Sequence, residues 1–205
     1  MQTQKLSSER NWQEEKVLVV KREYLFKDDA LQGLGKVDFD AYLKIIKEKK
    51  EFLPRGKMET DPNYKQIIPY LIFVHEEKFF LMQRKSKASE ARLQNKFTLG
   101  IGGHIREEDL NSDSIVDWAK REFHEEVNYS GNLEIEPMGL LNDDSNDVGK
   151  VHLGFVFLLK GDSAKISVKS ELESGKLATL EECKMHEAQM ETWSQLVFQF
   201  IEETL

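Results

Sequence analysis

The hydrophobic positions in the middle of the chain fall into short continuous runs, the pattern of buried strands. Two such runs, residues 65–74 and 78–84, flank the polar tripeptide HEE and predict a β-hairpin. Further apolar runs predict strands over residues 97–105, 132–141, 150–159 and 165–168. The first of these enters a glycine turn, and the middle of the chain is therefore predicted to be rich in strands.

The N-terminal part has a different pattern. Residues 16–26 are rich in β-branched and aromatic side chains and predict a strand. Residues 38–53 place apolar side chains at helical spacing with lysines opposite them, which predicts a helix. Pro54 and Gly56 predict its end.

Two further helices are predicted, over residues 114–127 and 179–205. Ser112, Asp113 or Ser114 would cap the first one, since each side chain can accept a hydrogen bond from the first turn. The apolar stripe of the second consists of Trp193, Leu196, Val197, Phe200 and Ile201.

The order of these elements predicts the fold class. Strand, helix, several strands, helix, strands and helix indicate a mixed sheet packed between helices, an α/β (α+β) sandwich. A polar connector near residues 57–64 predicts a boundary between an N-terminal strand-helix extension, residues 1–60, and a main domain, residues 61–205.

The helix over residues 114–127 carries its charges in an unusual place. With Ile115 at zero, Trp118 lies near −60° and Glu122, Glu126 and Glu125 lie near −20°, +20° and −80°, at about 100° per residue. The three glutamates thus continue the apolar stripe instead of opposing it. Like charges on one helix face repel, and partial burial raises the cost.

Two interpretations of the glutamate face stay open on these residues alone. A solvated acidic face is the ordinary explanation of a charge run. A cation site is the functional one, because hard divalent ions such as Mg²⁺ or Mn²⁺ take several carboxylate oxygens in one place.

Composition and charge exclude some classes of protein. The net charge of −8 argues against a protein that wraps nucleic acid by neutralising phosphates. Cys183 is the only cysteine, which excludes an intrachain disulfide and a metal site of several thiolates. The N-terminus has no apolar core and the run IIPYLIFV is too short to span a bilayer, so no membrane and a cytoplasmic location are expected.

The segment from the glycine turn to the end of the glutamate helix resembles the signature of the Nudix hydrolases. That signature is Gly, five residues, Glu, seven residues, Arg-Glu, an apolar residue, any residue, Glu-Glu, any residue and Gly. The matching positions are Gly103, Arg121, Glu122, Phe123, Glu125 and Glu126. The resemblance covers about residues 64–204 and implies a Nudix-type α/β/α sandwich.

The segment departs from the signature in three ways. Seventeen residues separate Gly103 from Arg121, four more than in the signature. The isolated glutamate has no clear counterpart, since Asp109 has the right distance to Gly103 and Asp113 the right distance to Arg121. Asn128 stands at the final glycine, a mild change because Asn tolerates the left-handed conformation common after a helix.

The resemblance implies a reaction and roles for its residues. Nudix hydrolases cleave a nucleoside diphosphate linked to a further group, using Mg²⁺ or Mn²⁺ and water. The carbonyl of Gly103 and the carboxylates of Glu122, Glu125 and Glu126 would hold the metal, and Arg121 would orient the glutamates. The general base is left open. The expected partner is a small nucleotide or other diphosphate substrate, not a nucleic acid polymer, and a homodimer is left open.

Two other functions are compatible with such a fold. A Nudix-fold sensor module would bind a nucleotide without cleaving it, but such a module would be expected to lose its glutamates. A prenyl diphosphate isomerase of related fold uses a catalytic cysteine, whereas Cys183 lies far along the chain from the glycine turn.

Four further side chains are weaker candidates. Glu171, or its neighbour Glu173, would supply another metal ligand or base, or be a solvated loop acid. Arg84 would bind a substrate phosphate or form a surface ion pair. His104 would contact substrate or be a structural histidine, and His124 is expected to point away from the glutamates.

Overall fold

The protein is described from a computed structural model, which covers residues 12–27, 30–85, 94–109, 114–169 and 172–204. Within these residues it contains a ten-stranded sheet and a two-stranded one. The large sheet consists of β1 (Lys16–Lys21), β2 (Gly33–Gly35), β3 (Glu51–Pro54), β4 (Tyr64–His75), β5 (Lys78–Arg84), β6 (Phe97–Thr98), β7 (Gly100–Gly102), β9 (Leu133–Asn142), β10 (His152–Gly161) and β12 (Leu172–Ala178). The small sheet consists of β8 (Val127–Asn128) and β11 (Ser167–Val168).

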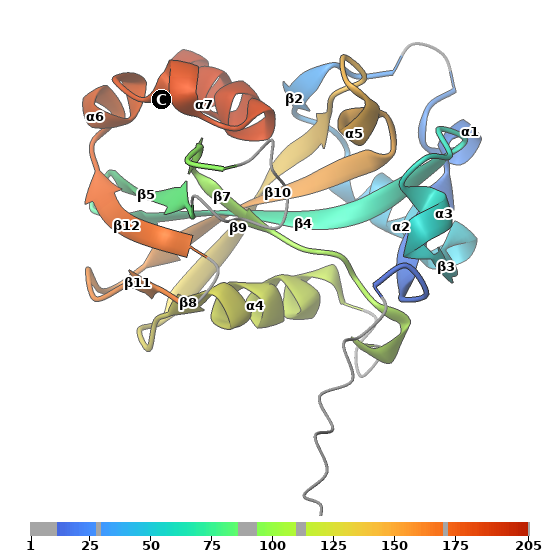
Figure 1. The fold of residues 1–205 in the computed structure, drawn as a ribbon, viewed down its shortest axis with the longest axis horizontal. Helices are drawn as coiled ribbons and strands as arrows, with labels where there is room; N and C mark the ends of the chain where they lie inside the picture. The colour runs from blue at the N-terminus through green and yellow to red at the C-terminus, as the bar shows by residue number, and fades with distance from the viewer. Residues whose placement is uncertain (1–11, 28–29, 86–93, 110–113, 170–171, 205) are drawn as a thin grey trace, which may run out of the picture.

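Helices cover both faces of the large sheet. They are α1 (Arg22–Leu25), α2 (Phe39–Lys49), α3 (Arg55–Met58), α4 (Ile115–Glu126), α5 (Asp147–Lys150), α6 (Leu180–Lys184) and α7 (Thr192–Thr204). In Figure 1, α4 lies against one face of the sheet, and α6 and α7 lie against the other. The predicted α/β/α sandwich with a mixed sheet is confirmed. No helix among the described residues has the length and apolar character needed to cross a membrane.

Two adjacent central strands hold the sandwich together. The main path of the sheet runs β12-β5-β4-β10-β9-β2, and β4 and β10 pair in parallel while β9 and β5 pair antiparallel beside them. Side chains alternate between the faces of a strand. Leu71 and Phe73 therefore join the core under α4, whereas Tyr70 and Ile72 join the core under α7.

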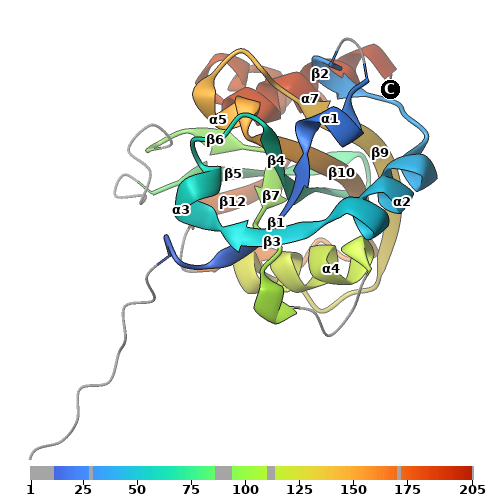
Figure 2. The same cartoon turned by 90° about the vertical axis from the view of Figure 1, so that its right-hand side faces the viewer.

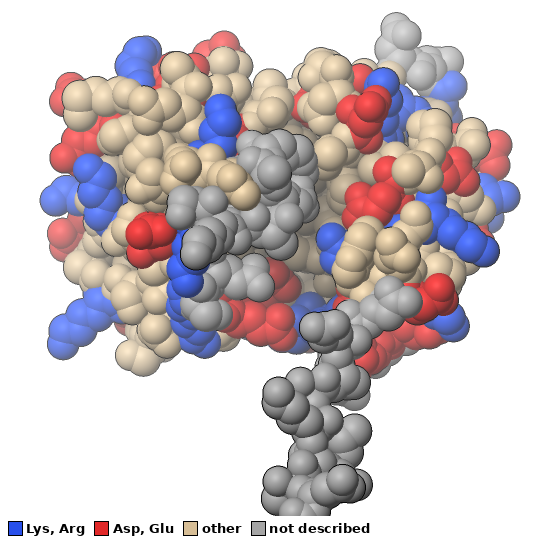
Figure 3. All heavy atoms as spheres, in the orientation of Figure 1, with Lys and Arg blue, Asp and Glu red and all other residues tan. Residues whose placement is uncertain are grey.

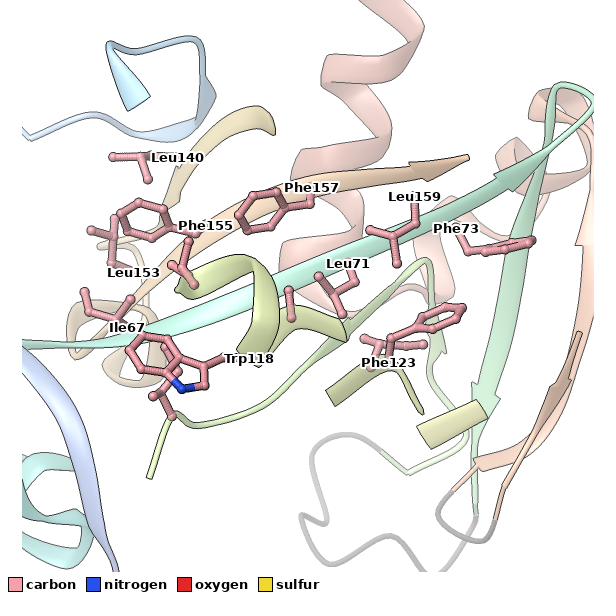
Figure 4. Packing of buried hydrophobic residues seen from close by; sticks show 14 of the residues in the cluster. Ile67, Leu71, Phe73, Trp118, Phe123, Leu140, Leu153, Phe155, Phe157 and Leu159 are labelled. Carbon is pink, nitrogen blue, oxygen red and sulfur yellow. The ribbon is translucent and has the colours of Figure 1, made fainter. Parts of the chain in front are cut away.

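The core under α4 is built from aromatic side chains. Trp118 of α4 lies beside Ile67 of the sheet, and Phe123 of α4 lies beside Phe73 (Figure 4). The rings of Phe73 and Phe123 stack with centroids 5.8 Å apart. This contact fixes the rotation of α4 and therefore the direction in which its glutamates point.

Two predictions about the N-terminal extension need correction. The strand predicted over residues 16–26 ends at Lys21, and Arg22–Leu25 form α1. The helix predicted over residues 38–53 ends at Lys49, and Glu51–Pro54 form β3 instead. The cause is pairing, since β3 lies antiparallel to β1 and extended backbone there makes ladder hydrogen bonds.

Glu173, considered above as a loop acid, lies instead on a strand. Leu172–Ala178 form β12, which pairs antiparallel with β5. Its sequence, LESGKLA, has glycine and serine in the middle and lacks the β-branched residues that identify strands. The neighbouring strand imposes the extended conformation.

The N-terminal extension contacts the glycine-turn segment directly. β1 pairs with β4, and the amide of Leu18 donates to the carbonyl of Ile105 over 2.7 Å. Figure 2 shows β1, β3 and α3 lying along the edge of the main sheet. The division at residue 60 stays a prediction, but strands from both sides of it pair in the large sheet.

Ser114 sets the start of the glutamate helix, and its removal is expected to weaken that start. Its hydroxyl accepts from the amide of Asp117 at 3.4 Å, a long cap. We expect Ser114→Ala to lower the free energy of unfolding by about 0.5 kcal/mol, because the Asp117 amide loses the hydroxyl and keeps only the Ser114 carbonyl, 3.1 Å away, as its acceptor. Urea unfolding measures this change. Ser114→Asp restores a capping oxygen, and equal losses in both variants would contradict the role of the cap.

Candidate functional site

The glutamate face of α4 lies at the end of the helix where the apolar stripe stops. Ile115, Trp118, Ala119 and Phe123 are buried. The Glu122 side chain retains only 13% of its exposure, whereas Glu125 is about half exposed at 49%. The helix thus buries one carboxylate and leaves a second one accessible.

Glu122 lies against the backbone of the glycine turn. A Cβ added at Gly103 would lie 2.1 Å from Oε1 of Glu122 and 2.4 Å from Oε2. Real Cβ atoms do not approach another heavy atom this closely, so a side chain at this position would displace the Glu122 carboxylate. The glycine turn and the helix face, which are 19 positions apart in sequence, therefore meet.

The surroundings of Glu122 disfavour its charge. Burial raises the pKa of Glu122 to about 7, against its ordinary value of 4.5. Arg121 opposes this rise, while Glu125 and Glu126 add to it and Arg106 opposes it more weakly. A cation beside these carboxylates would favour the charged form.

Arg121 connects the glutamates to the lengthened loop. It donates from Nη1 to Glu125 over 2.6 Å and from Nη2 to Asp109 over 3.0 Å. Asp109 also accepts from the amide and Nε of Arg106, at 3.0 and 3.1 Å. Of the two aspartates considered for the isolated acid of the signature, Asp109 therefore contacts this network, and Asp113 lies outside the described residues.

Arg84 is engaged in an ion pair. Its Nε donates to Oε1 of Glu191 over 2.7 Å. Burial lowers the pKa of Arg84, but Glu191 and, more weakly, Tyr70 and Glu126 outweigh burial and raise it overall. The side chain thus lies within electrostatic range of the glutamate face, and phosphate binding by Arg84 stays a prediction.

His104 lies at the end of the glycine turn and contacts a second histidine. Its Nε2 is 3.3 Å from Nε2 of His152, the first residue of β10. Burial lowers the pKa of His104 well below its usual range, and Arg55 and His152 lower it further. Sequence reasoning missed His152 and its neighbour Glu59, since nothing in the spacing of the chain links residues so far apart.

The remaining candidates are only partly placed by the structure. Glu171 lies outside the described residues. Glu173 is exposed on β12, and His124 is exposed on α4 as expected. Cys183 is buried in α6, and burial raises the pKa of its thiol to about 11. A thiol that stays protonated is a poor nucleophile, which argues against the isomerase alternative.

Comparison with known proteins gives two similar chains over nearly their whole length. Protein YmaB of Bacillus subtilis (strain 168) is 34% identical over 203 residues, which cover 92% of this chain and 98% of YmaB. Tm1382, whose crystal structure is assigned to the Nudix hydrolases, is 32% identical with a TM-score of 0.80, covering 93% of this chain and 100% of Tm1382. No family model matches the chain.

More distant structures share the fold alone. The NUDIX domain of Shewanella oneidensis NrtR, solved with ADP ribose, is 12% identical, with a TM-score of 0.55 over 68% of this chain and 87% of that domain. The fold, the glutamate face against Gly103 and the match to Tm1382 agree: the chain belongs to the Nudix hydrolase family.

Proposed function

We propose that this protein cleaves the pyrophosphate linkage of a nucleoside diphosphate derivative or a nucleoside triphosphate, by attack of water on phosphorus with Mg²⁺ or Mn²⁺. The observation that carries the proposal is the meeting of Glu122 with Gly103. It brings a backbone turn next to the carboxylate face of α4. Hard cations require such a concentration of oxygen atoms.

The residues present fit a divalent cation. The Gly103 carbonyl and the carboxylates of Glu122, Glu125 and Glu126 would supply oxygen ligands, the donor type that Mg²⁺ and Mn²⁺ prefer. Burial raises the pKa of Glu122 to about 7 although Arg121 and Arg106 oppose the rise, so a bound cation would further stabilise the ionised carboxylate. Bound metal would polarise the pyrophosphate and lower the pKa of the attacking water.

The chain's own side chains would position the reacting groups. Arg121 holds Glu125 by a charge-assisted hydrogen bond and is itself held by Asp109, so the carboxylates keep one arrangement. One of the glutamates, or a more distal acid such as Glu171, would take the proton of the attacking water. The leaving phosphate departs as the P–O–P bond breaks.

A substrate screen with and without metal tests this function. Nucleoside triphosphates, nucleotide sugars, ADP-ribose and dinucleotide polyphosphates are incubated with Mg²⁺ or Mn²⁺, and product release is measured. We expect turnover of at least one compound and its loss with a chelator. Tight nucleotide binding without turnover would instead support a sensor module, and turnover unaffected by chelation would exclude the metal.

Asp109 provides a second test, as a positioning residue. Asp109→Asn removes the charge that Arg106 and Arg121 share, so we expect kcat to fall about 10–100-fold, the usual cost of losing an outer-shell partner. KM should change little, because Asp109 is remote from the substrate in this proposal. The matched control is Glu107→Gln. Glu107 lies in the same 3-10 turn, Glu107–Asp109, and its ion pair among the described residues is with exposed Lys16. Equal kinetics of the two variants would contradict the role of Asp109.

A further inference from the structure

Three ligand-type side chains from distant parts of the chain meet beside the glycine turn. Glu59 ends α3 in the extension, His104 follows Gly103, and His152 begins β10. One ligand atom from each lies within 4.8 Å of the other two. None of the three belongs to the glutamate face of α4.

The spacing of the two histidines fits a shared metal ion. Their Nε2 atoms are 3.3 Å apart. Two nitrogens bound to one tetrahedral Zn²⁺ at about 2.1 Å lie about 3.4 Å apart. The pair thus needs little movement to hold an ion between them.

A hydrogen bond to the backbone sets the tautomer of the His152 imidazole. Nδ1 of His152 lies 2.7 Å from the carbonyl of Val148. A carbonyl only accepts hydrogen bonds, so Nδ1 carries the proton and the lone pair of Nε2 faces His104. Metal-binding histidines are commonly fixed by such a bond to a backbone carbonyl.

Glu59 is oriented in the same manner. Its Oε1 accepts from Nε of Arg55 over 3.0 Å. Arg55 also lies 3.7 Å from Glu15, so its positive charge is shared between two carboxylates. Ligating carboxylates are themselves usually hydrogen-bonded, and Arg55 would have this role.

A buried amide lies next to the cluster. Gln66 of β4 is opposite His152 of β10 in the parallel register, which places the two side chains on one face of the sheet. Gln66 is fully buried, and both its amide nitrogen and its oxygen have no hydrogen-bond partner among the described residues. A buried amide without a hydrogen-bond partner is destabilising, which indicates that a polar ligand belongs beside it.

We propose that Glu59, His104 and His152 form a second metal site, for a borderline transition-metal ion of the Zn²⁺ type, separate from the oxygen-ligand site on α4. Two imidazoles and one carboxylate suit Zn²⁺ and leave a fourth position for water, which the Gln66 amide would hydrogen-bond. The ion joins α3 of the extension to the glycine turn. The competing explanation is a hydrogen-bonded histidine pair beside an Arg55–Glu59 ion pair, which predicts no metal binding.

The test is a titration of the untagged, metal-stripped full chain with Co²⁺ and Zn²⁺ in excess Mg²⁺. The Mg²⁺ occupies oxygen ligands and does not compete for imidazole. We expect one tightly bound equivalent, seen by calorimetry and by the strong visible absorption of four-coordinate Co²⁺. We also expect His104→Asn and His152→Asn to lower the affinity by more than the about 10–100-fold that loss of an outer-shell partner costs.

Two further variants keep the result interpretable. His124→Asn removes an exposed histidine of α4 and should bind like the wild type. Glu59→Gln changes a partly exposed side chain, should leave the fold intact by circular dichroism, and should weaken binding while the imidazoles remain. The proposal is overturned if the wild type binds no Co²⁺ or Zn²⁺ in excess Mg²⁺, or if folded Glu59→Gln and His152→Asn bind like His124→Asn.

Discussion

Glu125→Gln and Glu126→Gln are each expected to lower kcat by about 10²–10⁴-fold, the range for loss of a group that assists proton transfer or charge stabilisation. Glutamine keeps the shape of the side chain but loses the negative charge that a divalent cation requires. Glu125 is half exposed and pairs with Arg121, so a neutral amide there leaves the core unchanged. Steady-state kinetics with Mg²⁺ on the substrate found by screening measures the effect.

The matched control for both substitutions lies on the same helix. His124→Gln changes an exposed side chain between Phe123 and Glu125 and should retain wild-type kcat. Circular dichroism and urea unfolding should show all three variants folded. If a folded glutamine variant turned over at the wild-type rate, the assignment of the metal to α4 would be wrong.

Glu122→Gln is expected to stabilise the metal-free protein at pH 8. The pKa of Glu122 rises from 4.5 to about 7 on folding, so the folded state binds more protons than the unfolded chain between these values. Stability therefore falls as pH rises through that window. Above it the buried charge costs about 3 kcal/mol, which the neutral amide avoids. We expect a higher urea midpoint for the variant at pH 8 and similar midpoints at pH 4, both with a chelator present.

Divalent cation should narrow this difference in stability. An ion that binds only the folded protein stabilises it by about 2.7 kcal/mol at a concentration 100 times its Kd. The wild type gains this, whereas Glu122→Gln has lost one of its oxygen anions and should gain less. Equal Mg²⁺-induced shifts in the unfolding midpoint of the two proteins would count against Glu122 as a ligand. If the urea midpoint of Glu122→Gln depended on pH as that of the wild type does, the buried charge of Glu122 would not be the cause of the pH dependence.

Acidic and basic side chains are interspersed over the face of the molecule in Figure 3. The glutamates of α4 are distinguished by their position on the helix. The angular positions of Ile115, Trp118 and Glu122 follow from helical geometry, and the structure buries Trp118 fully and Glu122 largely. Local periodicity was sufficient because the interactions that define a helix are local.

Predictions based on local signals were wrong where a neighbouring strand decided the conformation. β3, with the sequence EFLP, ends in proline, and β12, with the sequence LESGKLA, has serine, glycine and lysine at its centre. Neither sequence has the pattern that predicts a strand. Each is extended because it pairs with β1 or β5, which no local window contains. Conversely, the strand predicted through residue 26 ends at Lys21, where α1 begins and the β1–β4 pairing stops.

The sequence by itself determined the hairpin and the glutamate helix, and it predicted a divalent cation for the glutamate face, since periodicity and residue chemistry are properties of short segments. Only the tertiary structure decided that Glu122 lies against Gly103, and that Asp109 holds Arg121. It alone brought Glu59, His104 and His152 together. These contacts join residues separated by 12 or more positions, and they depend on sheet register and helix packing, which place side chains to within an ångström.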